Sequence, residues 1–191
     1  MAYKLISPPG IEPLTLAEVK LHLRVDYADD DTLITALITT ARQFAEMITQ
    51  RQIISAQWQL VLDYFPGMIH LDKCPLISLD SIKYIDMSGT SQTMPATDYV
   101  VDGSSEPVRI TPVFGKIWPI PVPQVGAVQV NFTSGYGTAE ANVPEGIKSW
   151  MKIRIASLYE HRAEIEIIQR SQMVEMPFVD RLLDPFRVVT V

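Results

Sequence analysis

The sequence predicts an α+β fold, in which two N-terminal helices and one long C-terminal helix form a helical bundle with an inserted antiparallel β-rich subdomain. Proline breaks helix interiors, and none of the 14 prolines lies in residues 15–65 or 145–176, whereas nine lie in 66–144. Apolar residues also recur every three or four positions in the outer segments and every second position in the middle. We therefore expect residues 1–55 and 144–191 to form a helical domain and residues 56–143 to form the insertion.

The first helix is predicted from a capping box. Thr15 is followed three residues later by Glu18, a pairing that satisfies backbone donors at a helix start. One apolar face then follows at helical spacing, formed by Leu16, Val19 and Leu23. We expect this short helix to end near Val25.

The other two helices are predicted from longer apolar stripes. The second is preceded by the aspartates 29–31, which oppose the helix dipole and cap free N–H groups, and extends to about Gln50. These aspartates do not predict a calcium loop, because the loop glycine and the closing glutamate are missing. The third helix starts after Pro144 and extends to about Glu164 or beyond, with an apolar face formed by Ile147, Trp150, Met151, Ile155, Leu158 and Tyr159.

Strands are predicted between these helices. Apolar and polar residues alternate in 57–64 and in 128–132, which is the period of a half-buried strand. Shorter strands are expected at 77–86, 99–101 and 108–110, separated by glycine turns. Residues 118–123 contain three alternating prolines, so we expect extended chain along an edge and no central strand.

Composition excludes several classes of function. The net charge is −6, and residues 56–144 carry 8 acidic and 4 basic side chains, so a basic footprint for nucleic acid is not expected. The single cysteine, Cys74, has no Cys or His partner at metal-finger spacing. No signal peptide and no membrane span is predicted, so we expect a cytoplasmic chain without a membrane partner.

No enzyme signature is present, and we predict neither a cofactor, a metal nor a catalytic residue. The three histidines lie in different predicted elements, without the spacing of a metal site or a nucleophile–base pair. The glycines of 135–137 follow a strand, where a phosphate could bind, but a dinucleotide fingerprint would need a third glycine where Glu140 stands. A turn is the favoured interpretation.

The C-terminal segment 177–187 concentrates apolar residues after a polar stretch. It has two interpretations. The segment either forms the last helix of the core or docks on a partner as a short amphipathic element with basic ends. The candidate docking residues are Phe178, Leu182, Leu183, Phe186 and Arg187.

The order of several short motifs resembles that of the head-tail connector (adaptor) family of tailed bacteriophages, in the longer form found in many prophages. The matching segments are 13–26, 30–34, 41–46, 118–119, 130–137, 143–148, 158–162 and 182–187. No single segment is specific, but together they run in one order from about residue 8 to residue 187.

The resemblance implies a structural virion protein without enzymatic activity. Such a protein would assemble as a ring of twelve subunits on the phage portal protein after DNA packaging and present a surface to a neck or tail-completion protein. It would occupy the host bacterial cytoplasm during assembly and then the virion neck, with duplex DNA passing through without specific binding. The resemblance also favours the docking interpretation of the C-terminal segment, as an element that reaches into the portal.

Two alternatives remain open at this stage. A tail-completion or stopper protein of the same assembly would share the size, the charge and the mixture of helices and strands, and differ only in its binding partner. A small-ligand-binding module is the other alternative, and it would need convergent polar groups in a pocket.

Overall fold

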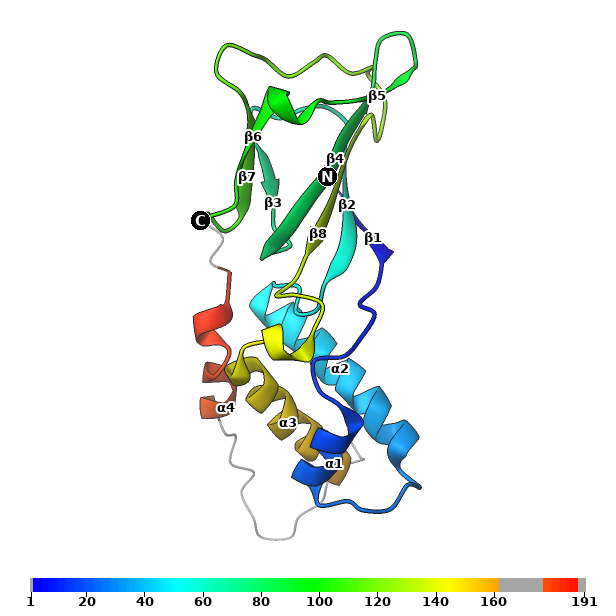
Figure 1. The fold of residues 1–191 in the computed structure, drawn as a ribbon, viewed down its shortest axis with the longest axis vertical. Helices are drawn as coiled ribbons and strands as arrows, with labels where there is room; N and C mark the ends of the chain where they lie inside the picture. The colour runs from blue at the N-terminus through cyan, green and yellow to red at the C-terminus, as the bar shows by residue number, and fades with distance from the viewer. Residues whose placement is uncertain (1, 162–176, 189–191) are drawn as a thin grey trace. The chain divides into compact units, whose positions relative to one another are not determined.

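The computed structural model describes residues 2–161 and 177–188 and confirms an α+β protein of helices and antiparallel sheets (Figure 1). The chain divides into two compact units. The sheet unit comprises Met1–Gly10, Gln50–Thr138 and Val188–Val191, and the helical unit comprises Ile11–Thr49 and Ala139–Arg187.

Two sheets make up the sheet unit. The first has five strands in the order β1-β2-β8-β4-β5, and the second has three in the order β3-β7-β6, with every pair antiparallel. The strands are β1 (Ala2–Ser7), β2 (Ala56–Leu62), β3 (Ile69–Leu71), β4 (Leu76–Ile85), β5 (Ser91–Thr93), β6 (Tyr99–Asp102), β7 (Val108–Pro112) and β8 (Val128–Ser134), and a 3-10 turn, η1 (Ala96–Asp98), precedes β6.

The N-terminal strand β1 departs from the predicted division, which placed residues 1–55 with the helices. β1 pairs with β2 from Ala2 opposite Val61 to Ser7 opposite Gln57. Tyr3 fixes this strand, because its ring packs edge-on against Phe132 and its hydroxyl accepts the backbone N–H of Asp72 at 2.9 Å. Burial raises the pKa of Tyr3 well above its ordinary value.

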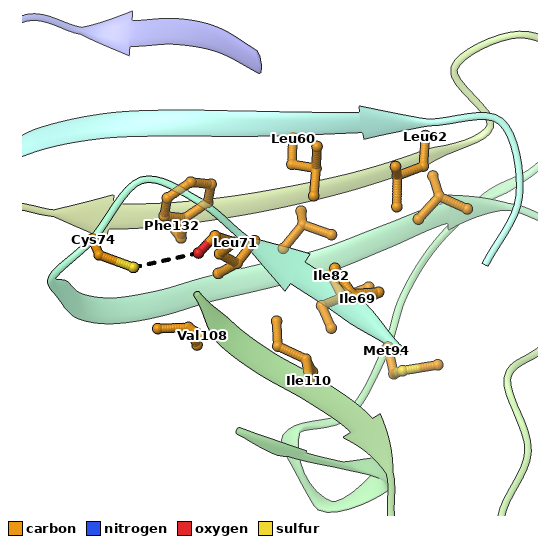
Figure 2. Close-up of a cluster of buried hydrophobic side chains, with 12 residues drawn as sticks. Leu60, Leu62, Ile69, Leu71, Cys74, Ile82, Met94, Val108, Ile110 and Phe132 are labelled. Atoms are coloured by element: carbon orange, nitrogen blue, oxygen red, sulfur yellow. Dashed lines mark hydrogen bonds between the residues drawn. The ribbon is translucent and has the colours of Figure 1, made fainter. Parts of the chain in front are cut away.

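The core of the sheet unit lies between the two sheets (Figure 2). Period-two alternation sends every second residue of β2 and β8 into this layer, including the fully buried Leu60 and Phe132. Ile69 and Ile110 meet them from the second sheet. Cys74 belongs to the same cluster, where its Sγ donates to the carbonyl of Leu71 at 3.4 Å and burial raises the pKa of the thiol.

The proline-rich segment 118–123 forms no strand, as predicted. The Trp118 ring stacks on Phe65 with 4.9 Å between centroids and 6° between planes, and its indole N–H donates to the carbonyl of Gly67. The backbone N–H of Val122 donates to the carbonyl of Ile85 at the end of β4. These contacts hold an extended chain without a ladder of hydrogen bonds.

Three longer helices form most of the helical unit, and α2 packs on α3 while α1 contacts both. The helices are α1 (Leu16–Leu23), α2 (Asp31–Thr49), α3 (Glu145–Glu160) and the short α4 (Pro177–Arg181), with 3-10 turns η2 (Glu140–Asn142) and η3 (Asp184–Phe186). Among the described helices, none combines the length and the apolar character of a membrane-spanning segment.

The predicted starts and ends of α1 and α2 agree with the structure to within two residues. The Thr15–Glu18 capping box is formed in both directions, and α1 stops at Arg24, which adopts a left-handed backbone conformation. The third helix ends at Glu160, and the predicted extension beyond residue 161 lies outside the described residues.

One buried cation ties α2 to the chain that precedes α1. Arg42 is almost fully buried, and its guanidinium donates to Glu12 at 2.7 Å through Nε and to Glu46 at 2.9 Å through Nη1. These hydrogen bonds outweigh the effect of burial and raise the pKa of Arg42, so the group remains charged. The charges of the inner side of α2 are therefore paired within the helical unit.

Candidate functional site

The C-terminal segment, formed by α4 and η3, packs against the N-terminal half of α3. Asp180 of α4 accepts the indole N–H of Trp150 at 3.1 Å, which satisfies the one polar group of a buried aromatic side chain. Leu183, between α4 and η3, is 0% exposed, and Trp150 is 1% exposed. The segment is thus part of the core of the helical unit in this conformation.

Phe186 contacts α3 where that helix carries glycine. A Cβ atom built on Gly146 would lie 2.9 Å from Cε2 of Phe186, closer than real carbon atoms approach. Glycine in the first turn of α3 therefore leaves the space that the Phe186 ring fills. Sequence reasoning missed Gly146 and Asp180 in this contact, and it predicted Trp150 only as part of the apolar face of the third helix. The glycine inside a helix was an available signal, because glycine costs a helix about 1 kcal/mol relative to alanine.

The five predicted docking residues have different environments. Leu183 is buried, and Leu182 and Phe186 are half-buried. Arg187 is exposed, with its guanidinium 3.3 Å from the Asp184 carboxylate. Phe178 lies in α4, and its side chain lies outside the described residues. The docking role of these residues stays a prediction, and Leu183 would contact a partner only if the segment left α3.

Two of the three backbone amides of the glycine turn at 135–137 donate to other parts of the sheet unit. The backbone N–H of Gly135 donates to the carbonyl of Pro75 at 2.9 Å, and that of Tyr136 donates to Ile53 at 3.0 Å. A Cβ on Gly135 would lie 2.7 Å from the backbone nitrogen of Ser55. Residues 135–137 bring two segments of backbone together, which favours their interpretation as a turn.

The aspartates at the start of α2 make contacts within the helical unit. The Asp30 carboxylate accepts the hydroxyl of Tyr159, and the Asp31 carboxylate pairs with Lys20 at 2.5 Å. The hydrogen bond to Asp30 raises the pKa of Tyr159. Within residues 2–161 and 177–188, no group of three or more His, Cys, Asp or Glu side chains could hold a metal ion.

Two cavities of the sheet unit have mainly apolar walls. One of about 270 Å³ is lined by Tyr84, Met94, Trp118 and their neighbours, and its one charged lining group, Asp98, already pairs with Lys116. The other, of about 250 Å³, is lined by Leu60, Leu62 and their apolar neighbours and also by Asp63, Tyr64 and His70. The Asp63 carboxylate already accepts the backbone N–H of Gly126 at 2.8 Å. In both cavities a carboxylate of the lining is thus engaged by another group of the chain.

Comparisons with known proteins find one similar family by sequence and similar chains of one kind of particle by fold. The family model for phage gp6-like head-tail connector proteins matches residues 13–88, which include α1, α2 and β2 to β4. The resemblance noted from the sequence motifs is therefore confirmed over that part of the chain. No curated protein sequence matches.

Solved structures extend the likeness to the whole chain. A chain in the virion of a native gene transfer agent particle has the same fold, with a TM-score of 0.82, 24% identity and coverage of 100% of this chain and 97% of that chain. Chains from the neck of the empty particle, computed with C6 symmetry, and of the native particle, computed with C12 symmetry, have TM-scores of 0.80 and 0.73 at 22% and 21% identity, with the same coverage. At these identities the likeness concerns the fold.

Proposed function

We propose that this chain is a head-tail connector, or adaptor: a structural virion protein that assembles as a ring on the portal vertex after DNA packaging and links the portal protein to the neck or tail. It acts without catalysis, is present in the host bacterial cytoplasm during assembly and then in the virion neck. In this proposal the helical unit is the connector domain, and residues 50–138 of the sheet unit are inserted into it, with β1 added to their sheet from the N-terminal side.

The observation that carries this proposal is that the fold of this chain matches, along its full length, the folds of chains from gene transfer agent particles and their necks. The family match covers only residues 13–88, but the matched folds cover 100% of this chain and 97% of theirs. Two of those particle structures were computed with C6 and C12 rotational symmetry. Rotational symmetry supports a ring in which each subunit offers two different surfaces to its neighbours.

The charge pattern supports passage of duplex DNA without specific binding. Phosphate contacts need exposed Lys and Arg side chains. Three cations of the sheet unit already pair with carboxylates of that unit: Arg51 with Glu106, Arg109 with Asp102, and Lys116 with Asp98. The segment 56–144 has twice as many acidic as basic side chains. Such a surface would let DNA slide past without retention.

The test is co-sedimentation of the purified full-length chain with DNA-filled, tailless heads of its phage. A second variant, ending at Met176, removes the segment predicted to dock on the portal. We expect the full-length chain to sediment with heads. Loss of binding by the truncated chain, provided that it remains folded by circular dichroism, supports docking through residues 177–187.

Other outcomes point elsewhere. If both forms bind heads, the connector role holds and the segment belongs to the subunit core or to a contact between subunits. If neither form binds heads but the full-length chain binds isolated tails, the chain is a tail-completion or stopper protein of the same assembly.

A further inference from the structure

The outer face of α2 lacks charge. In this helix of 19 residues, seven are exposed and none of these is charged: Thr32, Leu33, Thr35, Ala36, Gln43, Phe44 and Met47. We call these seven residues the α2 outer face. By contrast, three of the five exposed residues of α3 are charged, namely Glu145, Arg154 and Glu160 among 145–160. A solvated helix face normally carries charged residues opposite its apolar stripe.

The charged residues of α2 lie off this face and have partners in the helical unit. Asp31 pairs with Lys20, and Arg42 pairs with Glu12 and Glu46. Covering the α2 outer face therefore breaks none of these ion pairs, and the seven residues of the face carry no charge that would be desolvated. Arg154 of α3 borders the face at Phe44. Burying an unpaired charge is the largest penalty that an interface normally meets.

The shape of the face suits another protein surface. From Thr32 to Met47 it extends about 22 Å at 1.5 Å per residue. Small side chains, Ala36 and the threonines, alternate with Leu33 and Phe44, each 36% exposed. Small residues allow helices to approach closely, and the larger ones fill the grooves between side chains. The ring of Phe44 is held in place by the Arg154 guanidinium, 5.6 Å from its centroid.

We propose that the α2 outer face is one of the two surfaces through which neighbouring copies of this chain contact each other in the ring. This inference rests on the proposed function. A nucleic acid fits the face poorly, because its seven residues offer no cation to phosphate and the bordering Arg154 already lies over the ring of Phe44. A second copy does, since interfaces between identical subunits are more apolar than others, and matched particle necks were computed with sixfold and twelvefold symmetry.

The area of the face explains why copies assemble on a template. One face of a single helix buries a few hundred Å², whereas a stable interface needs about 800 Å² per partner. Contacts of this size act together once many copies are held on one platform. The chain is therefore expected to be monomeric when dilute and to form its ring on heads.

The experiment compares a charged variant with an uncharged variant of nearly the same shape. A36E/Q43E places two carboxylates on the α2 outer face, while A36Q, which retains the native Gln43, keeps the face neutral, and Glu and Gln have similar helix propensity. Both variants should unfold at the same temperature as the wild type, since both positions are exposed. Copies bound per DNA-filled head are counted by mass spectrometry against a head protein. We expect A36Q to load like the wild type and A36E/Q43E to load at least about tenfold less.

Equal loading of A36E/Q43E and the wild type overturns the inference and leaves the connector role intact. A photo-reactive benzoylphenylalanine in place of Gln43 provides a second readout. A cross-link to another copy on heads supports the inference, whereas a cross-link to a different virion protein overturns it. If the wild type does not bind heads, the proposed function fails, and the same cross-linking on the concentrated purified chain decides the inference: a cross-linked dimer supports it and its absence overturns it.

Discussion

At Gly135 a positive φ and a close approach of a second backbone segment coincide. Its φ is 137°, a conformation reserved for glycine, and a Cβ there would meet backbone atoms of Ile54 and Ser55 at 2.7–2.8 Å. Gly115 also has a positive φ, of 84°, but no atom lies within 4 Å of a Cβ built on it. A side chain at Gly135 would therefore meet both backbone strain and a steric clash, whereas a side chain at Gly115 would meet backbone strain alone.

We expect Gly135→Ala to lower the free energy of unfolding by about 3 kcal/mol or more, because strain and a backbone clash add. Gly115→Ala, with strain alone, should lower it by about 1–2 kcal/mol. Denaturant titration of both variants measures the difference. Equal losses would mean that the turn at 135–137 moves away from Ser55 in solution.

Asp86 gives a pH-dependent test at the turn between β4 and β5. Hydrogen bonds from Ser88, Gln92 and Thr90 lower the pKa of its carboxyl to about 2. A lowered pKa in the folded state means that the contribution to stability is present above the unfolded value of about 3.9 and is lost as the pH falls towards 2.

NMR titration of the Asp86 carboxyl carbon should therefore show a midpoint near pH 2. Ser88→Ala removes the largest cause of the shift, the hydroxyl hydrogen bond, and should move the midpoint up towards the ordinary value. An unchanged midpoint in that variant would show that the hydroxyl does not donate to Asp86 in solution.

At the scale of elements, the helices were predictable because their signals are local. The capping box at Thr15 and the apolar stripe of α2 each lie within one helix, so the sequence alone gives their starts and ends. β1 was not predictable in the same way. Its six residues are mostly exposed, and the contacts that fix it, from Tyr3 to Asp72 and Phe132, join residues about 70 and 130 positions apart.

The contacts of the C-terminal segment, which forms the candidate site, were also not predictable from local sequence signals. Its apolar residues were visible in the sequence, but their pairing with Gly146 and Trp150 depends on the fold. Leu183 and Arg187 now serve as a matched pair, one buried in the helical unit and one exposed in an ion pair with Asp184.

Leu183→Ala should destabilise the protein by about 2–4 kcal/mol, because it leaves a cavity against α3. Arg187→Ala should change stability by less than about 0.5 kcal/mol, since exposed ion pairs contribute little. Thermal unfolding of both variants tests this. A loss below 0.5 kcal/mol for Leu183→Ala would mean that the segment is not packed on α3 in solution, which would favour the docking interpretation.

At the scale of the whole molecule, composition and charge argued against a basic nucleic-acid-binding surface and a membrane span. The order of the short motifs then indicated a protein of the virion neck. The division into units could not be read from residue patterns, because the first ten residues join a sheet whose other strands begin some fifty residues later. Contacts between copies were also beyond the sequence, since they depend on which helix faces remain exposed after folding.

The net charge of −6 and the paired cations lead to a prediction for the intact chain. Purified protein should show no measurable binding to duplex DNA at about 50 mM salt up to about 10 μM protein, a condition in which basic proteins bind non-specifically. Fluorescence anisotropy with a labelled 30-base-pair duplex measures this, with a basic DNA-binding protein as positive control. Sub-micromolar affinity would contradict the proposal of passage without binding.

The position of Cys74 also has a practical consequence. It is the one cysteine in the sequence, and it lies fully buried between the two sheets with a raised thiol pKa. A thiol reagent such as a disulfide dye can therefore modify the native protein only when the sheets separate, so its rate of reaction reports the opening of the sheet unit alone. The slowing of that reaction on binding to heads would measure how far assembly stiffens a unit that carries none of the proposed contacts.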